Sequence, residues 1–403
     1  MVILPNDINC DNTSSNNNPD FVTKYRRVDF YSNYIDLPKK IKVAIHVFTG
    51  DTATGLQNNA AGIAALKNII KTVNGFYDNN SPFTDLLPDS INAAAPLPTN
   101  IHFDWGDEDH PRIYFYSNTK YWAGDGGSFI SRALDYIKKN NALSLDALPI
   151  IFCGNSGVSF TRIPYPDYIG GGSNAGALDG DEYVRMNSRC DISQQIYAYG
   201  QNLMHELGHA VDLMHTYGPG SCYPETCDEN STDYLSDLFG IIPKGKGSEC
   251  LYEAGWSCPL EVGKPWPHCS NDVMDGVATV SYYWSPLQID KMHRACYIKT
   301  LRKYVEECPV SPNPFVINHN ELWNFDIRLY QNLEINSGDT LTIKGKVHLP
   351  ENGKIIIKKG GTLIVDGGTI DAACIGKWQG IIRKGKKAIL IVKNNAIIKE
   401  NKK

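Results

Sequence analysis

The stretch 205–215, HELGHAVDLMH, constrains the chain more than any other feature of its 403 residues. Upstream of it, apolar residues recur close to a 3.6-residue period, which predicts an amphipathic helix: Ile192, Ile196, Leu203 and Leu207. On that helix His205 and His209 are one turn apart on the same face, so both imidazoles can hold one Zn²⁺. Glu206 lies beside them, where a carboxylate polarises a metal-activated water.

His215 follows six positions after His209 and is the candidate third ligand. A straight helix would carry His215 away from the metal, so the chain must bend sharply after His209. Such a bend needs a residue with φ > 0, which is usually glycine. The hinge position is occupied by Asp212, and aspartate is one of the few other residues that enters the left-handed region at tolerable cost. The three-ligand hypothesis therefore requires a left-handed Asp212.

The pattern H-E-x-x-H-x-x-x-x-x-H resembles the zinc site of the metzincin peptidases. In that family a methionine turn packs beneath the zinc ligands, and Met274 in residues 271–276 (NDVMDG) resembles it. Next, Ser285 to Gln288 predict a capping box with proline at the first helical position. The order of zinc helix, cysteine-rich loop, methionine turn and helix resembles the pappalysin-like branch, over residues 40–308.

This resemblance implies an α+β catalytic domain, with a twisted mixed sheet, an active-site helix and a small C-terminal subdomain. It also implies that the strand before the helix is the sheet edge that binds extended substrate; the residues concerned are Tyr183, Val184, Arg185 and Met186. Several metzincins place a tyrosine two residues after the turn methionine to stabilise the oxyanion. Gly276 stands there in this chain, so Tyr282 or Tyr283 is the candidate for that role.

Periodicity predicts the remaining elements of this domain. Strands are expected at 42–48, 100–105, 113–116 and 148–153, and helices at 60–76 and 128–139. The glycine-rich residues 170–180 lack the Lys-Ser/Thr ending of a phosphate-binding loop and are predicted to form a flexible rim.

Composition indicates which partners and which cellular location the chain is expected to have. A net charge of −5 gives no argument for nucleic acid, and no apolar run is long enough to span a membrane. Residues 1–5 lack the features of a signal peptide, but most of the 11 cysteines cluster around the zinc motif, which suits the disulfides of a secreted or cell-surface protein. Reduced cysteines in a cytosolic enzyme remain the alternative.

The irregular stretch after His215 carries a group of acidic residues: Asp228, Glu229, Asp233 and Asp237. Carboxylate oxygens of this kind can bind Ca²⁺, although their spacing does not match an EF-hand loop. A solvated acidic loop is the other interpretation, and both stay open.

Beyond the proline-rich residues 309–318 the pattern changes to short β-rich runs separated by Gly-rich turns. Such runs predict an all-β domain, either a solenoid or a sandwich. Segments such as residues 360–369 (GGTLIVDGGT) resemble the β-helical repeats attached to exported bacterial proteins. We expect this domain to bind a cell surface or another protein.

The predicted organisation has a flexible lead-in at 1–22 and a peptidase domain at 23–308, divided into upper (23–212) and lower (213–308) parts. A linker at 309–318 and a β-rich domain at 319–403 follow. The first functional hypothesis is a secreted zinc endopeptidase that cleaves protein or peptide substrates with Glu206 as general base and acid. The second is a non-catalytic adhesion or binding protein that uses the metzincin fold as a scaffold.

Overall fold

The computed structural model describes part of the chain, namely residues 38–49, 56–78, 98–117, 127–153, 160–162, 183–187, 196–213, 273–274, 283–298, 300–306, 310–373 and 377–399. Contacts divide the chain into two units, Met1–Arg294 and Ala295–Lys403. Each unit is described by itself. No helix of the described residues is long and apolar enough to cross a membrane.

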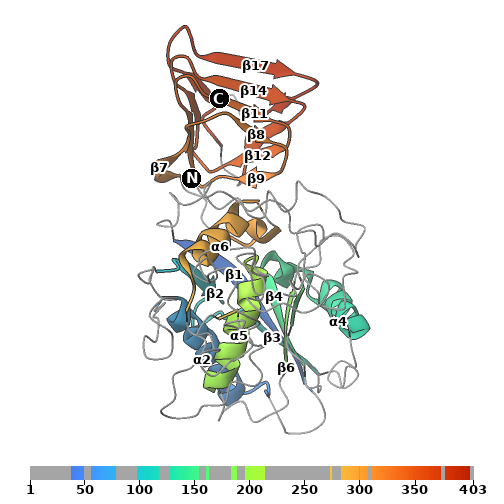
Figure 1. Cartoon of the computed structure of the whole chain (residues 1–403). Helices are drawn as coiled ribbons and strands as arrows, with labels where there is room; N and C mark the ends of the chain where they lie inside the picture. The colour runs from blue at the N-terminus through green and yellow to red at the C-terminus, as the bar shows by residue number, and fades with distance from the viewer. Residues whose placement is uncertain are drawn as a thin grey trace, which may run out of the picture. The chain divides into compact units, whose positions relative to one another are not determined.

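A six-stranded mixed sheet forms the centre of the first unit (Figure 1). Its strands are β1 (Lys39–Thr49), β2 (Ile101–Asp104), β3 (Ile113–Ser117), β4 (Leu148–Cys153), β5 (Phe160–Arg162) and β6 (Tyr183–Asn187). The spatial order is β2-β1-β4-β6-β5, and β3 pairs with a later part of β1. All pairs are parallel except β5 with β6. In β1 the residues from Val43 to Val47 are all buried, as expected for a strand covered on both faces.

Helices α2 (Ala60–Asp78), α4 (Gly127–Asn140) and α5 (Ile196–Ala210) accompany the sheet. Ala133, Leu134 and Ile137 of α4 pack on Phe48 and Ile151 of the sheet. Helices α2 and α5 lie side by side in Figure 1. Their approach is close at Gly200, where an added Cβ would lie 2.7 Å from the Thr72 side chain. A hydrogen bond from the Tyr77 hydroxyl to the Met204 carbonyl (3.4 Å) also joins them. Helix α5, which bears His205 and His209, is therefore held against α2.

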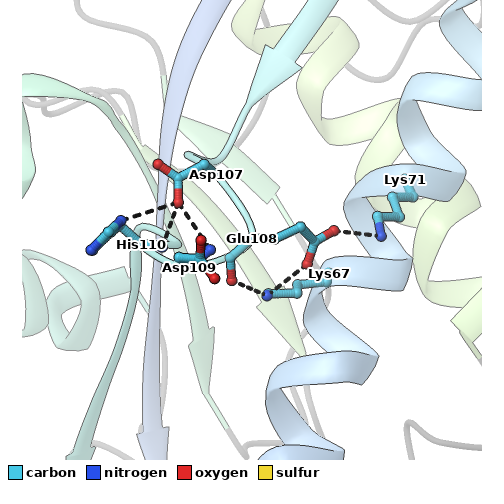
Figure 2. A network of polar contacts seen from close by, with 6 residues as sticks. All are labelled: Lys67, Lys71, Asp107, Glu108, Asp109 and His110. Atoms are coloured by element: carbon cyan, nitrogen blue, oxygen red, sulfur yellow. Dashed lines mark hydrogen bonds and ion pairs between the residues drawn. The ribbon is translucent and has the colours of Figure 1, made fainter.

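Ion pairs join the turn between β2 and β3 to helix α2 (Figure 2). Glu108 accepts hydrogen bonds from Lys67 (2.8 Å) and Lys71 (2.9 Å). Asp107 accepts hydrogen bonds from the backbone N–H groups of Asp109 and His110. The bonds from the two lysines lower the pKa of Glu108 to about 2. This exposed network orders the turn, and its strength will depend on ionic strength.

The predicted position of the substrate edge is corrected by the strand order. Strand β6, which contains Tyr183 to Met186, pairs with β4 on one side and with β5 on the other. The edge of the described sheet on this side is therefore the three-residue β5, in which Thr161 lies opposite Val184. Strand β5 is not predicted from the sequence, because three residues are too few to show an alternating pattern.

In the second unit, strands succeed one another around a stack of coils. Three strands make each of four coils: β7 (Ser311–Ile317), β8 (Glu321–Trp323) and β9 (Ile327–Arg328); β10 (Gln331–Ile335), β11 (Thr340–Ile343) and β12 (Lys346–Leu349); β13 (Ile355–Ile357), β14 (Thr362–Asp366) and β15 (Thr369–Ala372); β16 (Ile381–Arg383), β17 (Ile389–Lys393) and β18 (Ile397–Ile398). Every third strand pairs in parallel, which gives three four-stranded sheets. Of the two expected arrangements, this pairing corresponds to a solenoid.

Stacked aliphatic side chains fill the interior of these coils. Leu341 pairs with Leu363, which pairs in turn with Leu390, and the first two are fully buried. At the start of the unit, the first coil is hydrogen-bonded to the segment that precedes it. Arg328 donates to the carbonyls of Arg302 (2.6 Å) and Val305 (2.9 Å), and the Tyr330 hydroxyl donates to the carbonyl of Cys296 (2.7 Å).

The proline-rich residues 309–318 were predicted to form a linker, and over most of their length this is wrong. Residues Ser311–Ile317 form β7, which pairs in parallel with β10. Proline lacks the N–H group of a ladder, so it is excluded from central strands but tolerated at an edge. Strand β7 is the terminal strand of its sheet, which explains how Pro312 and Pro314 are accommodated.

Candidate metal centre

The two histidines of the motif lie on the last turns of α5, as their spacing predicts. Their ring centroids are 4.9 Å apart and the ring planes are nearly perpendicular, at 89°. The Nδ1 atom of His205 lies 2.7 Å from the carbonyl oxygen of Val273, and the Nδ1 atom of His209 lies 2.8 Å from that of Leu213. A carbonyl oxygen only accepts, so each Nδ1 carries the proton and donates it.

This hydrogen bonding fixes the state in which an imidazole binds metal. With the proton on Nδ1, the lone pair on Nε2 is left for a ligand, and the ring orientation is set by the carbonyl. Burial lowers the pKa of His205, and the hydrogen bond to Val273 opposes this in part, so the ring is neutral near pH 7. Two imidazoles held one helical turn apart, each with its proton on Nδ1, fit the nitrogen ligands of Zn²⁺.

Helix α5 ends in a turn that is built around Asp212. This residue has φ = +77°, as the three-ligand hypothesis requires. The Leu213 N–H donates to the Gly208 carbonyl (3.0 Å) and the Asp212 N–H donates to the His209 carbonyl (3.0 Å). These two bonds define a Schellman motif with Asp212 in the position that glycine usually takes. The turn brings the Leu213 carbonyl back onto the ring of His209.

The carboxylate of Asp212 is buried and points to helix α6 (Pro286–Ile298). Its Oδ2 atom lies 3.0 Å from the Nζ atom of Lys291 and 3.9 Å from a guanidinium nitrogen of Arg294. Lys291 is fully buried, and Arg294 and Asp212 are nearly so. Sequence reasoning missed both cations, because nothing in the helical pattern of α6 marks them as partners of the zinc helix.

Met274 lies directly against helix α5. It is fully buried, and a Cβ added at Gly208 would meet its Sδ atom at 2.5 Å and the Trp284 ring at 3.0 Å. Glycine at 208 thus permits the close approach of Met274 to α5. The residue before it, Val273, supplies the carbonyl that holds His205, and its own N–H donates to the Tyr283 carbonyl at 3.0 Å.

The capping box predicted at the start of α6 is confirmed. The Ser285 N–H donates to Oε1 of Gln288 (2.8 Å), and the Gln288 N–H donates to Oγ of Ser285 (3.2 Å). Farther along α6, His293 donates from Nε2 to the Thr99 carbonyl at 2.7 Å, just before β2. Helix α6 is thus anchored at its start and in its middle.

Glu206 and Tyr283 are buried, with 5% and 2% of their surfaces exposed. Glu206 therefore lies within the protein rather than in solvent, on the same helix as His205 and His209. The roles of Glu206 and Tyr283 in catalysis stay predictions.

Several predicted residues lie outside the described part of the chain: His215, Tyr282 and the acidic residues Asp228, Glu229, Asp233 and Asp237. Among the described residues no group of three or more His, Cys, Asp or Glu side chains is placed to hold a metal. Cys296 is fully buried, and the cysteines clustered between 222 and 269 lie outside the described ranges.

The sheet and the histidine helix define a mixed α/β protein with a potential two-histidine metal site. No protein-family model matches the sequence, and no curated protein matches it. Among solved structures, mirolysin in complex with compound 9 is similar at a TM-score of 0.41 and 19% identity, covering 67% of this chain and 96% of that one.

Mature mirolysin of Tannerella forsythia in complex with a cleaved peptide has a TM-score of 0.41 and 18% identity, over 66% of this chain and 95% of that one. A promirolysin mutant of the same organism has a TM-score of 0.43 and 18% identity, over 69% of this chain and 87% of that one.

Proposed function

We propose that the chain is a zinc-dependent endopeptidase. The observation that carries this proposal is the anchoring of both Nδ1 atoms by backbone carbonyls, which puts the lone pair of each ring on Nε2, with the two ring centroids 4.9 Å apart. His215 is the proposed third ligand, and the left-handed Asp212 supplies the turn that this role requires. When bound, Zn²⁺ supplies Lewis acidity, lowering the pKa of water and polarising a substrate carbonyl.

The chain's own residues perform the proton transfers in this proposal. Glu206 accepts the proton of the attacking water and passes it to the leaving amine. Burial of Glu206 and the apolar surface of Met274 beneath the histidines keep bulk water from the helix side of the site.

The substrate in this proposal is a protein or peptide in extended conformation. Strand β5 is the edge next to β6 in the described sheet, so a substrate strand would pair there rather than on β6. The order of elements along the chain supports a pappalysin-like member, and the cysteine cluster supports export to the medium or the cell surface.

Glu206→Gln tests the catalytic part of the proposal. It should leave zinc content unchanged and lower peptidase activity by about 10²–10⁴-fold, because the general base is lost while the ligands remain. Zinc is measured by mass spectrometry of the dialysed protein and activity with an unstructured casein substrate. Glu351→Gln, at an exposed turn of the second unit, is the matched control. Activity of Glu206→Gln within threefold of the parent would refute the assigned role.

His215→Ala tests the ligand set. The substitution removes one of three proposed protein ligands, so zinc affinity and activity should fall together. Unchanged zinc affinity would mean that another residue is the third ligand. Asp212 is a poor substitute, because its carboxylate is paired with Lys291, and His268 would be the next candidate.

A non-catalytic binding protein is the second candidate function. It is favoured by the exposed aliphatic side chains on β17, where Ile389, Ile391 and Val392 are each more than 40% exposed. A parent chain that holds zinc but cleaves no peptide would support this alternative.

A further inference from the structure

Two buried cations lie behind the zinc helix, on an element that supplies none of the proposed ligands. Lys291 is fully buried on α6, and Arg294 follows it on the same helix face, one turn on. A buried ammonium group is costly unless it is paired, and the carboxylate of Asp212 is one such partner of Lys291. The pair therefore joins α6 to the single residue on which the end of α5 turns.

We propose that Lys291 is a positioning residue for the imidazole of His209, acting through Asp212; this rests on the proposed zinc function. The connection is continuous. Lys291 Nζ lies 3.0 Å from Asp212 Oδ2, Asp212 holds φ = +77°, and the next carbonyl, that of Leu213, accepts from Nδ1 of His209 at 2.8 Å. A change in the ion pair is transmitted to the ring by one turn of backbone.

The ion pair restricts the backbone conformation of residue 212, which a glycine at this position could not do. Glycine reaches φ > 0 freely but also reaches many other conformations, whereas aspartate enters this region at a cost of about 1–2 kcal/mol. A carboxylate that must meet Lys291 and Arg294 confines residue 212 to one conformation. The Leu213 carbonyl is confined with it, and so is the orientation of His209.

The other end of the connection is rigid as well. Helix α6 is capped by Ser285 and Gln288 and is bonded to the sheet through His293 and the Thr99 carbonyl. The carbonyl that orients His205 belongs to Val273, whose N–H is bonded to the Tyr283 carbonyl just before α6 begins. Both imidazoles are thus oriented by backbone that α6 or its leading residues hold in place.

The test measures zinc affinity of the full chain by competition with a chelator, at a temperature where circular dichroism shows every variant to be folded. Lys291→Met keeps the length of the side chain and removes its charge. We expect zinc affinity to fall about 10–100-fold, the range found when groups that orient metal ligands are lost. Lys291→Arg should restore affinity to within about threefold, since the charge is kept.

Lys139→Met, at an exposed position of α4, controls for the loss of a lysine charge and should not change zinc affinity. Folded Lys291→Met that binds zinc as tightly as the parent would overturn the proposal, because a purely structural role lowers the melting temperature without changing the affinity of the folded protein. If Lys291→Met does not fold, Asp212→Asn carries the same test, because asparagine tolerates φ > 0 and removes only the charge. A parent chain that binds no zinc would instead refute the proposed function.

Discussion

Asp212 combines a backbone role and a charge role in one residue, and the two make opposite predictions for glycine. The left-handed φ alone predicts that Asp212→Gly relieves strain of about 1–2 kcal/mol. The same substitution leaves Lys291 and Arg294 without their carboxylate, and breaking a buried pair costs on the order of 3–5 kcal/mol. The second effect is larger.

We therefore predict that Asp212→Gly is destabilising by a few kcal/mol, in the lower part of that range. Asp212→Val should be worse, because a β-branched residue at φ > 0 adds strain to the lost charge. Urea unfolding in the presence of EDTA measures both without a contribution from metal. Finding Asp212→Gly at least as stable as the parent would show that the ion pair contributes nothing net.

His46 gives a second prediction at the residue scale, concerning pH. It is fully buried on β1, stacks on Tyr114 and Tyr116, and its Nδ1 lies 3.0 Å from the Tyr116 hydroxyl. No hydrogen-bond partner for its Nε2 lies among the described residues. Burial lowers the pKa of His46 to about 3, from an ordinary value of 6.5.

Between pH 6.5 and about 3 the unfolded chain binds a proton at residue 46 that the folded chain does not bind. The free energy of unfolding must therefore decrease as the pH falls through this window, by up to about 1.4 kcal/mol per pH unit. His46→Phe should flatten this dependence, because the group that takes up the proton on unfolding is removed. Unfolding curves at several pH values between 4 and 7 measure the slope; an equal slope in His46→Phe and the parent would contradict the prediction.

Helix α6 is the element on which the site depends most, although the proposed ligands lie elsewhere. Its start is set by the reciprocal bonds of Ser285 and Gln288. Ser285→Ala should lower the free energy of unfolding by about 1 kcal/mol, within a range of 0.5–2, because one N–H of the first turn loses its acceptor. Thermal unfolding of the zinc-free chain measures it, and Ser285→Thr should recover most of the loss. A Ser285→Ala chain as stable as the parent would contradict a stabilising cap.

Sequence patterns predicted the features that are encoded locally. The helix that bears His205 and His209, the left-handed Asp212 and the capping box each follow from residues within one or two turns of one another. Contacts between distant segments left no such signature. The edge strand β5 is too short for a pattern, and the carbonyls that hold the imidazoles belong to the apolar Val273 and Leu213. In the sequence, Lys291 occupies what looks like an ordinary polar position of an amphipathic helix, so its burial is not predicted.

At the scale of the whole molecule, the two units differ in how their strands are connected. The sheet of the first unit joins segments far apart in the sequence, such as β1 with β4, whereas each coil of the second unit pairs with its neighbours. Leu363→Ala in β14 removes a fully buried side chain from between two coils and should cost about 2–5 kcal/mol of stability. Urea unfolding of this variant against Thr362→Ala, on the same strand, measures it. A loss below 1 kcal/mol would contradict close packing between these coils.

Pairing between neighbouring coils also has a consequence for amide hydrogen exchange. A stack of this kind approximates a one-dimensional array, in which opening can begin at an end and proceed rung by rung. Strands β10 and β13 have coils on both sides, whereas β16 has one described neighbour. Deuterium should therefore enter β16, β17 and β18 first and reach β13 and β10 later, so that exchange rates report the order of the coils along the chain.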